Sequence, residues 1–383
     1  MKREIFISDY ALLCATSSGS EGAQTQSALD AIFENKSGLR KEKNRYIGRV
    51  ENLRPLPTTL HPYATCQAQL AYSTLFPMSA SIQKAREKWG AERVAVLVGT
   101  STGGIAWTES HYPNALQGSA FIKHGFGAIA TMIQTQFDLA GPAYTISTAC
   151  SSSAQIFGSA RRLISQNIAD AVLLLGVDTL CDLTLQGFEG LGLLSKERCR
   201  PFDIERDGIN IGEAGGALLL ERERLGQRDS FALRGFGSAS DGYHITRPPP
   251  DGEGAARTMQ FALDDAELSP KDVAALNAHG TGTLENDRAE STAIQSIFGT
   301  EIPVVSTKGF TGHTLGACGT VDAIISIESL KRQRLPGTIG FKKAEEASKI
   351  SLDANPVDIA GKFIASNSFA FGGNNVTLIF EKL

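Results

Sequence analysis

The sequence lacks the features that mark several classes of protein. Its 383 residues carry a net charge of −4 with no basic run, a balance that is typical of a cytosolic enzyme and unsuited to nucleic acid. No apolar run approaches the roughly 20 residues that a membrane helix needs, and the stretch 1–15 contains Asp9 and no good signal-cleavage site. We therefore expect a cytoplasmic protein with neither a nucleic-acid partner nor a membrane span.

Cysteine is also scarce, and its spacing excludes two further classes. No C-x-x-C pair, H-x-x-x-H pair or Cys/His cluster supplies the ligands of a zinc site, and the thin spread of thiols argues against a disulfide scaffold. We expect a reducing compartment and no metal. The six cysteines are Cys14, Cys66, Cys150, Cys181, Cys199 and Cys318.

Glycine and apolar residues, by contrast, are plentiful. The chain has 39 glycines and 42% hydrophobic residues, which suit a large buried core with many tight turns between strands and helices. This composition and length predict one large α/β unit or two closely packed halves.

The stretch 145–164 is the one around which the chain is organised. Small and β-branched residues lead to Cys150, and small or apolar residues then recur at helical spacing, so we expect a strand that turns sharply into a helix. At such a turn the helix start and its free N–H groups favour a thiolate and can hold an oxyanion. A buried structural cysteine is the alternative, but the small neighbours leave room for a substrate.

The second half repeats the first in outline. Residues 274–283 run from a strand into a Gly/Thr turn, as residues 94–104 do, and residues 303–330 resemble the strand, turn and helix around Cys150. We predict two related halves, residues 1–228 and 229–383, that bring their functional turns to one face.

Two histidines lie in these turns. A single histidine at a strand end is more often structural, but His279 and His313, together with Lys308 and Cys150 in equivalent turns, indicate a catalytic site. The remaining histidines are interpreted as surface or packing residues, namely His61, His111, His124 and His244.

With these motifs the chain resembles the decarboxylating, elongating β-ketoacyl-acyl-carrier-protein synthases of the thiolase superfamily. The resemblance covers nearly the whole chain and is carried by the stretches 148–153, 200–208, 279–283 with Asp287 and Glu290, 308–313 and 367–375. It implies the α/β, five-layer αβαβα thiolase fold. It also implies a homodimer, or a heterodimer with a paralogous synthase or chain-length-factor subunit. An acyl carrier protein would present the substrates on its phosphopantetheine arm, with no other cofactor.

The resemblance further implies a role for each site residue. The Cys150 thiolate would accept an acyl group, and an enolate formed by decarboxylation of malonyl-carrier would then attack that thioester. His279 and His313 would stabilise the enolate oxygen, and the backbone N–H groups of Cys150 and Phe371 would form the oxyanion hole. The other implied roles are Phe371 as a gate, Lys308 holding Glu290 and the histidines, Asp287 and Glu290 as supports, and Thr102 in the acyl pocket.

Residue types also separate neighbouring branches of this superfamily. Initiating synthases carry Asn where this chain has His313, thiolases use a second Cys near the C-terminus, and chain-length factors lack the nucleophile. A Cys-His thioester hydrolase and a non-catalytic or weakly active partner subunit remain as alternatives. A housekeeping fatty-acid pathway and a specialised polyketide or polyene pathway both remain open.

The carrier-binding surface departs from the usual pattern. The stretch 56–83, which normally supplies basic residues for an acidic carrier, holds no Lys or Arg. Either a second subunit supplies the docking surface or other basic residues form a displaced patch, the candidates being Arg40, Lys41, Lys43, Arg45, Arg49, Arg161 and Arg162.

Overall fold

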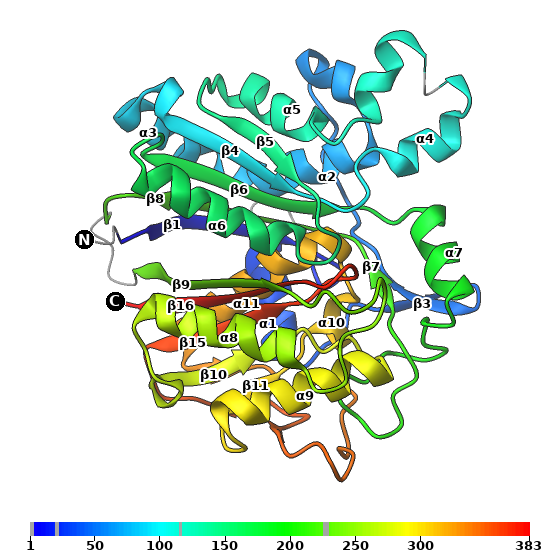
Figure 1. Cartoon of the computed structure of the whole chain (residues 1–383). Coiled ribbons are helices and arrows are strands. Elements are labelled where there is room, and N and C mark those ends of the chain that lie inside the picture. The colour runs from blue at the N-terminus through cyan, green and yellow to red at the C-terminus, as the bar shows by residue number, and fades with distance from the viewer. Residues whose placement is uncertain (1–3, 20–22, 115–116, 225–229) are drawn as a thin grey trace.

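The computed structural model describes residues 4–19, 23–114, 117–224 and 230–383 (Figure 1). Its centre is an 11-stranded sheet in the order β13-β11-β10-β15-β16-β9-β1-β8-β6-β4-β5. The strands of this sheet are β1 (Phe6–Leu13), β4 (Val94–Gly99), β5 (Ala143–Ile146), β6 (Ala171–Asp178), β8 (Ala214–Glu221), β9 (Phe231–Ser240), β10 (Val273–Asn277), β11 (Pro303–Val305), β13 (Ser351–Leu352), β15 (Phe363–Ser368) and β16 (Asn374–Lys382).

The sheet contains the same strand order twice. The order β5-β4-β6-β8-β1 corresponds to β11-β10-β15-β16-β9, and in both series two parallel pairings are followed by two antiparallel ones. The two series meet where Phe6 and Ile7 of β1 pair with Ala232 and Phe231 of β9. The boundary predicted at 228/229 falls within 225–229, outside the described residues.

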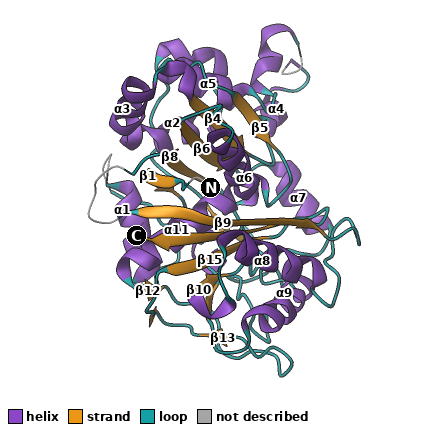
Figure 2. Ribbon diagram, turned by 60° about the vertical axis from the view of Figure 1, so that its left-hand side comes forward, coloured by secondary structure: helices purple, strands orange, loops and turns teal. Residues whose placement is uncertain are grey.

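Helices separate the two series into layers (Figures 1 and 2). Helices α6 (Ser152–Ser165) and α11 (Cys318–Arg332) lie between the series, and the outer faces are covered by α2 (Cys66–Leu75), α3 (Ser79–Trp89) and α5 (Ala128–Phe137) on one side and by α8 (Glu253–Ala266) and α9 (Leu284–Phe298) on the other. Strand β4 shows the sequence basis of this arrangement, because Ala95 and Leu97 pack toward the central helices while alternate residues pack outward. The predicted αβαβα fold is confirmed.

Proline and glycine explain where one helical pattern is interrupted and why another helix is hard to predict from the sequence. The helical pattern 63–89 is interrupted at Pro77, which lies in the 3₁₀ turn η2 (Phe76–Met78) between α2 and α3, where its missing N–H is tolerated. Glycines at 187, 190 and 192 favour a loop over the stretch 187–194, but its first residues belong to α7 (Asp182–Gly190). The helix is hard to predict from the sequence because two of its residues are glycine and none is fully buried.

No helix in the described ranges is long and apolar enough to cross a membrane.

The remaining elements are short, apart from α1. These elements are α1 (Gln24–Phe33), α4 (Ile105–His111), α10 (Lys308–Thr311), β2 (Arg40–Glu42), β3 (Arg45–Gly48), β7 (Ile211–Gly212), β12 (Arg334–Leu335), β14 (Val357–Asp358) and the 3₁₀ turns η1 (Thr58–Tyr63), η3 (Ala91–Arg93), η5 (Gly118–Lys123), η6 (Pro270–Asp272) and η7 (Leu315–Ala317).

Candidate active site

Cys150 lies in a tight turn between β5 and α6. The preceding residue, Ala149, has a φ of +49°, a left-handed conformation that is uncommon outside glycine and that turns the chain abruptly. Gly99 of β4 lets the first turn of α6 approach closely, because a Cβ there would lie 2.4 Å from the Cα of Ser153. The sequence therefore holds Cys150, which is only 7% exposed, at the start of a helix fixed against the sheet.

His313 contacts the cysteine directly. Its Nε2 atom lies 3.0 Å from Sγ of Cys150. The backbone of His313 is fixed by β7, since its N–H donates to the carbonyl of Asn210 at 2.7 Å and its carbonyl accepts from Gly212 at 3.0 Å. The backbone therefore holds the imidazole within hydrogen-bond distance of the sulfur.

His279 lies beside His313 and is held by Glu290 of α9. The two imidazole rings are 5.2 Å apart in an edge-to-face arrangement. The Glu290 carboxylate accepts the backbone N–H of His279 at 2.8 Å and that of Gly280 at 2.7 Å. It also accepts the side-chain amide of Asn367 at 3.1 Å. Glu290 thus supports the turn that carries His279.

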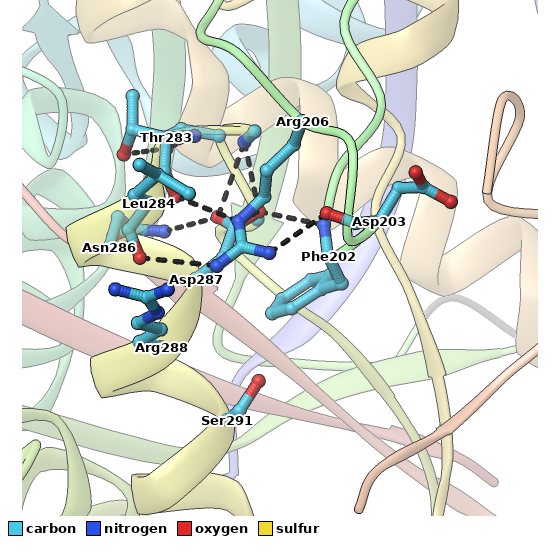
Figure 3. A network of polar contacts seen from close by, with 12 residues as sticks. Phe202, Asp203, Arg206, Thr283, Leu284, Asn286, Asp287, Arg288 and Ser291 are labelled. Atoms are coloured by element: carbon cyan, nitrogen blue, oxygen red, sulfur yellow. Dashed lines mark hydrogen bonds and ion pairs between the residues drawn. The ribbon is translucent and has the colours of Figure 1, made fainter. Parts of the chain in front are cut away.

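Asp287 fixes the other end of the same turn (Figure 3). Its carboxylate accepts the backbone N–H of Phe202 at 2.7 Å and that of Gly282 at 3.2 Å. The guanidinium of Arg206 lies 3.6 Å away and also pairs with Glu345 at 3.0 Å. This network ties the segment 200–208 to α9, so the two stretches have a common structural role.

Lys308 has a different partner from the one predicted. Its ammonium group is buried and lies 3.2 Å from the carboxylate of Asp322 in α11, which also accepts the hydroxyl of Thr307 at 2.6 Å. Contact with Glu290 was expected, and Glu290 instead acts on Lys308 only through its charge. The reason is that α11 carries a carboxylate of its own close to the start of α10.

Burial keeps both histidines neutral and the thiol protonated. Burial, together with the Lys308 charge, lowers the pKa of His313 to about 3. The same two effects, with the neighbouring His313, lower the pKa of His279 well below its usual value. Burial raises the pKa of Cys150 to about 12, although Lys308 acts in the opposite direction. The helix start alone was expected to favour the thiolate. Burial has the larger effect on the pKa, so the thiol stays protonated.

Phe371 contributes through both its backbone and its ring. The backbone N–H groups of Phe371 and of Cys150 itself are directed at the cysteine sulfur and lower its pKa. Gly372 and Gly373, which follow, have φ values of +82° and +74°, so the loop adopts a conformation that favours glycine. The Phe371 ring lies 5.7 Å from that of Phe188 in α7.

A cavity of about 210 Å³ joins these groups to the surface. Its lining includes Cys150, both active-site histidines and Phe371, so a substrate entering it meets the thiol and both imidazoles. His244, predicted to be a plain surface residue, is exposed but also lines this cavity, as does Arg247. Sequence periodicity could not reveal this, because both residues lie in a loop without regular spacing.

Thr102 is hydrogen-bonded to a buried carboxylate and does not line the cavity. Its hydroxyl donates to the carboxylate of Asp178 at 2.6 Å, and it is not among the described residues that line the cavity. Asp178 also accepts the backbone N–H of Gly316 at 2.6 Å and so joins the 99–104 turn to the segment after His313. The role of Thr102 in an acyl pocket stays a prediction.

No metal-binding arrangement is found in the part of the chain that the structure describes. There, no group of three or more His, Cys, Asp or Glu side chains is placed to hold a metal ion. All six cysteines are free thiols.

The duplicated strand order and central helical layer define a thiolase-like fold, and comparisons with known proteins identify the family. The N-terminal domain of beta-ketoacyl synthases matches residues 67–225, and the C-terminal domain matches residues 231–342. The chain therefore belongs to the beta-ketoacyl synthase family.

Relatives of known name and structure agree with this assignment. A 3-oxoacyl-[acyl-carrier-protein] synthase 2 from Coxiella burnetii is 33% identical over 79% of this chain and 81% of its own length. A synthase of the same name from Staphylococcus aureus is 34% identical over 76% of each chain. A ketosynthase solved in complex with its chain length factor, from Xenorhabdus doucetiae, matches 100% of this chain and 98% of its own with a TM-score of 0.91 and 32% identity. A beta-ketoacyl synthase from Burkholderia phymatum has a TM-score of 0.87 at 27% identity.

Proposed function

We propose that the protein is a 3-oxoacyl-[acyl-carrier-protein] synthase that uses Cys150 as its nucleophile. The sulfur takes an acyl group from a carrier thioester and releases the carrier thiol. Malonyl-carrier then loses carbon dioxide, and the resulting enolate carbon attacks the Cys150 thioester. The products are a 3-oxoacyl-carrier, lengthened by two carbons, and the free Cys150 thiol.

The contact between Cys150 and His313 is the observation that carries this proposal. Both residues line a cavity that His279 also lines. His313, neutral because of burial, can accept the thiol proton as the sulfur attacks the incoming thioester. Once the sulfur is acylated, both neutral imidazoles can donate N–H groups to the enolate oxygen. The backbone N–H groups of Cys150 and Phe371 suit the oxyanion of the acyl-transfer step.

A reconstituted assay tests the proposal. Purified protein with an acyl-carrier and malonyl-carrier should release carbon dioxide and form the 3-oxoacyl-carrier, and peptide mass spectrometry should find the acyl group on Cys150. The Cys150→Ala variant should form no product. Acylation at another cysteine, or condensation by that variant, would refute the assignment.

The hydrolase alternative is less well supported. A Cys-His-acid hydrolase orients its imidazole by a carboxylate on Nδ1, whereas the Nδ1 atom of His313 is buried with no hydrogen-bond partner among the described residues. Hydrolysis would also leave Lys308 and His279 without a role. The intact nucleophile likewise disfavours a purely structural subunit.

Besides the carrier, the proposed function includes a second partner. This is another synthase-like subunit, either a second copy of the chain or a paralogue. The sheet ends at β5, where Tyr144 is 38% exposed. Tyr112, just after α4, is 71% exposed, and Phe121, in η5, is 53% exposed. An uncovered strand edge beside exposed aromatic residues is typical of a subunit interface. The ketosynthase of Xenorhabdus doucetiae is described in complex with a chain length factor.

We further propose that the carrier is an acyl carrier protein of a specialised pathway and that the enzyme works in the cytoplasm. The free cysteines fit a reducing compartment. The candidate basic patch on β2 and β3 is partly neutralised, because Arg40, Arg45 and Arg49 pair with Glu51, Glu189 and Glu42, respectively. Arg161 pairs with Asp265. These pairings favour a carrier surface contributed in part by the second subunit.

A further inference from the structure

Helix α7 forms a wall of the active-site cavity but is only loosely anchored. None of its residues is fully buried, while Phe188 and, just beyond the helix, Leu191 line the cavity. Phe188 packs against a small apolar cluster that includes Ile209 and Ile211. Elements with so little burial open at low cost in free energy, so the contacts at the ends of α7 decide where it sits.

The start of α7 is held by a carboxylate from another helix. Glu109 of α4 accepts the backbone N–H of Asp182 at 2.9 Å with one oxygen and that of Leu183 at 2.7 Å with the other. The first N–H groups of a helix lack partners within it and carry a partial positive charge, so a bidentate carboxylate there is stabilising. Glu109 therefore caps α7 across a tertiary contact.

The other end of α7 contacts the ring proposed as the gate. Phe188 lies near the C-terminal end of the helix, with its ring centroid 5.7 Å from that of Phe371. A series of contacts thus runs from Glu109 through α7 and Phe188 to Phe371. Helices α4 and α7 are neighbours on one side of the molecule (Figures 1 and 2). Helix α4 is followed directly by Tyr112, one of the exposed aromatic residues proposed to bind the second subunit.

We propose that Glu109 is a positioning residue that holds α7, and through Phe188 the Phe371 ring, in the closed arrangement until Cys150 is acylated. This inference rests on the proposed function and on the gate role of Phe371 that the family resemblance implies. Without the Glu109 contact, Phe371 opens early and malonyl-carrier reaches an unacylated site. Malonyl-carrier then loses carbon dioxide, the enolate takes a proton from solvent, and acetyl-carrier forms in place of the 3-oxoacyl product.

The test compares two rates in the full-length protein with its carrier. The Glu109→Gln variant keeps the side-chain size but loses the charge and one acceptor oxygen. We expect the ratio of uncoupled decarboxylation to condensation to rise about five-fold, which corresponds to a cap worth ~1 kcal/mol. Glu109→Asp, which retains the charge but cannot reach as far, should change the ratio in the same direction.

A matched control and a double variant separate positioning from general stability. Asp272 is also a surface capping carboxylate, accepting the N–H and hydroxyl of Ser269 at 2.7 Å, and it does not line the cavity. Asp272→Asn should leave the ratio unchanged. In a Phe188→Ala background, Glu109→Gln should add nothing further.

Three outcomes would overturn the inference. They are an unchanged ratio in both Glu109 variants, the same rise in Asp272→Asn, and a full additional rise in the Phe188→Ala background. Failure of the wild-type protein to condense at all would overturn the proposed function, and this inference with it, and the wild-type rate in the same assay distinguishes that case.

Discussion

His313 contacts the sulfur of Cys150 directly, with Nε2 3.0 Å from Sγ, whereas His279 is connected to the pair through the His313 ring, 5.2 Å away. The two histidines are thus unequal before substrate binds. One can exchange a proton with the nucleophile, and both can face a substrate oxygen in the cavity. This difference predicts that the two half-reactions depend on them to different degrees.

The first prediction separates the histidines by half-reaction. Replacing His313 by Ala should slow acyl transfer to Cys150 by about 100-fold or more, the usual contribution of a general base. Replacing His279 by Ala should slow that step much less. Both variants should lose malonyl decarboxylation. Rapid-quench labelling of Cys150 measures the first step and carbon dioxide release the second. Equal slowing of acyl transfer in the two variants would contradict this division.

The second prediction concerns the reactivity of the free thiol. Because burial raises the pKa of Cys150 to about 12, little thiolate is present at neutral pH. Alkylation of Cys150 by iodoacetamide should therefore rise about ten-fold per pH unit from pH 8 to pH 10 without a plateau. Labelling of exposed Cys66 in the same sample shows that the reagent is active at each pH. A plateau near pH 7 would show that the thiol is ionised in the free enzyme.

The third prediction tests the buried pair of Lys308 and Asp322. Asp322→Asn leaves a buried ammonium without its counter-charge, so the free energy of unfolding should fall by about 3–5 kcal/mol. Adding Lys308→Met should restore most of that stability but no condensing activity, because the charge that acts on Cys150 and both histidines is then absent. Urea titration measures the stability. A double variant less stable than Asp322→Asn would rule out this pairing.

The fourth prediction uses the pKa of Glu290, which burial raises from 4.5 to about 7. A carboxyl whose pKa is higher in the folded state stabilises the fold below its unfolded pKa, and this contribution is lost as the pH rises through the folded pKa. The free energy of unfolding of the wild type, relative to Glu290→Gln, should therefore decrease between pH 4.5 and 7. Urea titrations at several pH values give the difference. A constant difference would mean that Glu290 does not titrate in this range.

The fifth prediction concerns the partners. Because the candidate basic patch on β2 and β3 is partly neutralised, the protein alone should turn over a housekeeping carrier slowly. A co-expressed paralogous subunit and the carrier encoded beside the gene should restore the rate. Efficient elongation by the protein alone on a housekeeping carrier would exclude a specialised pathway. A steep salt dependence of the protein alone would instead indicate docking on the displaced basic patch.

Much of the fold could be predicted from local pattern, because strands and helices of a layered α/β protein leave strong periodic signals. The turn at Cys150 combines β-branched residues, small residues and a helical repeat, and the structure has β5, the turn and α6 at those positions. Helix α7 left a weaker signal, because none of its residues is fully buried and glycines interrupt its pattern.

The site was predictable in its residue types but not in its pairings. Lys308 and Asp322 are 14 residues apart and meet only because the chain folds back to bring the first residue of α10 beside α11. Still, an acidic residue within a helix of small and apolar residues is a detectable sign of a buried charge. The protonation state of Cys150 could not be predicted either, because it depends on a balance between burial and helix-start donors that exists only in the folded chain.

The central layer also determines the distance over which the proton moves. Cys150 precedes α6 and His313 precedes α11, and these helices touch so closely that a Cβ on Gly319 would lie 2.3 Å from the backbone N of Ala154. Cys318, at the start of α11, donates to the carbonyl of Cys150 at 3.0 Å. The distance between Cys150 and His313 therefore depends on how closely the two halves of the chain pack. One added methyl group at Gly319 would push α6 and α11 apart and lengthen that distance.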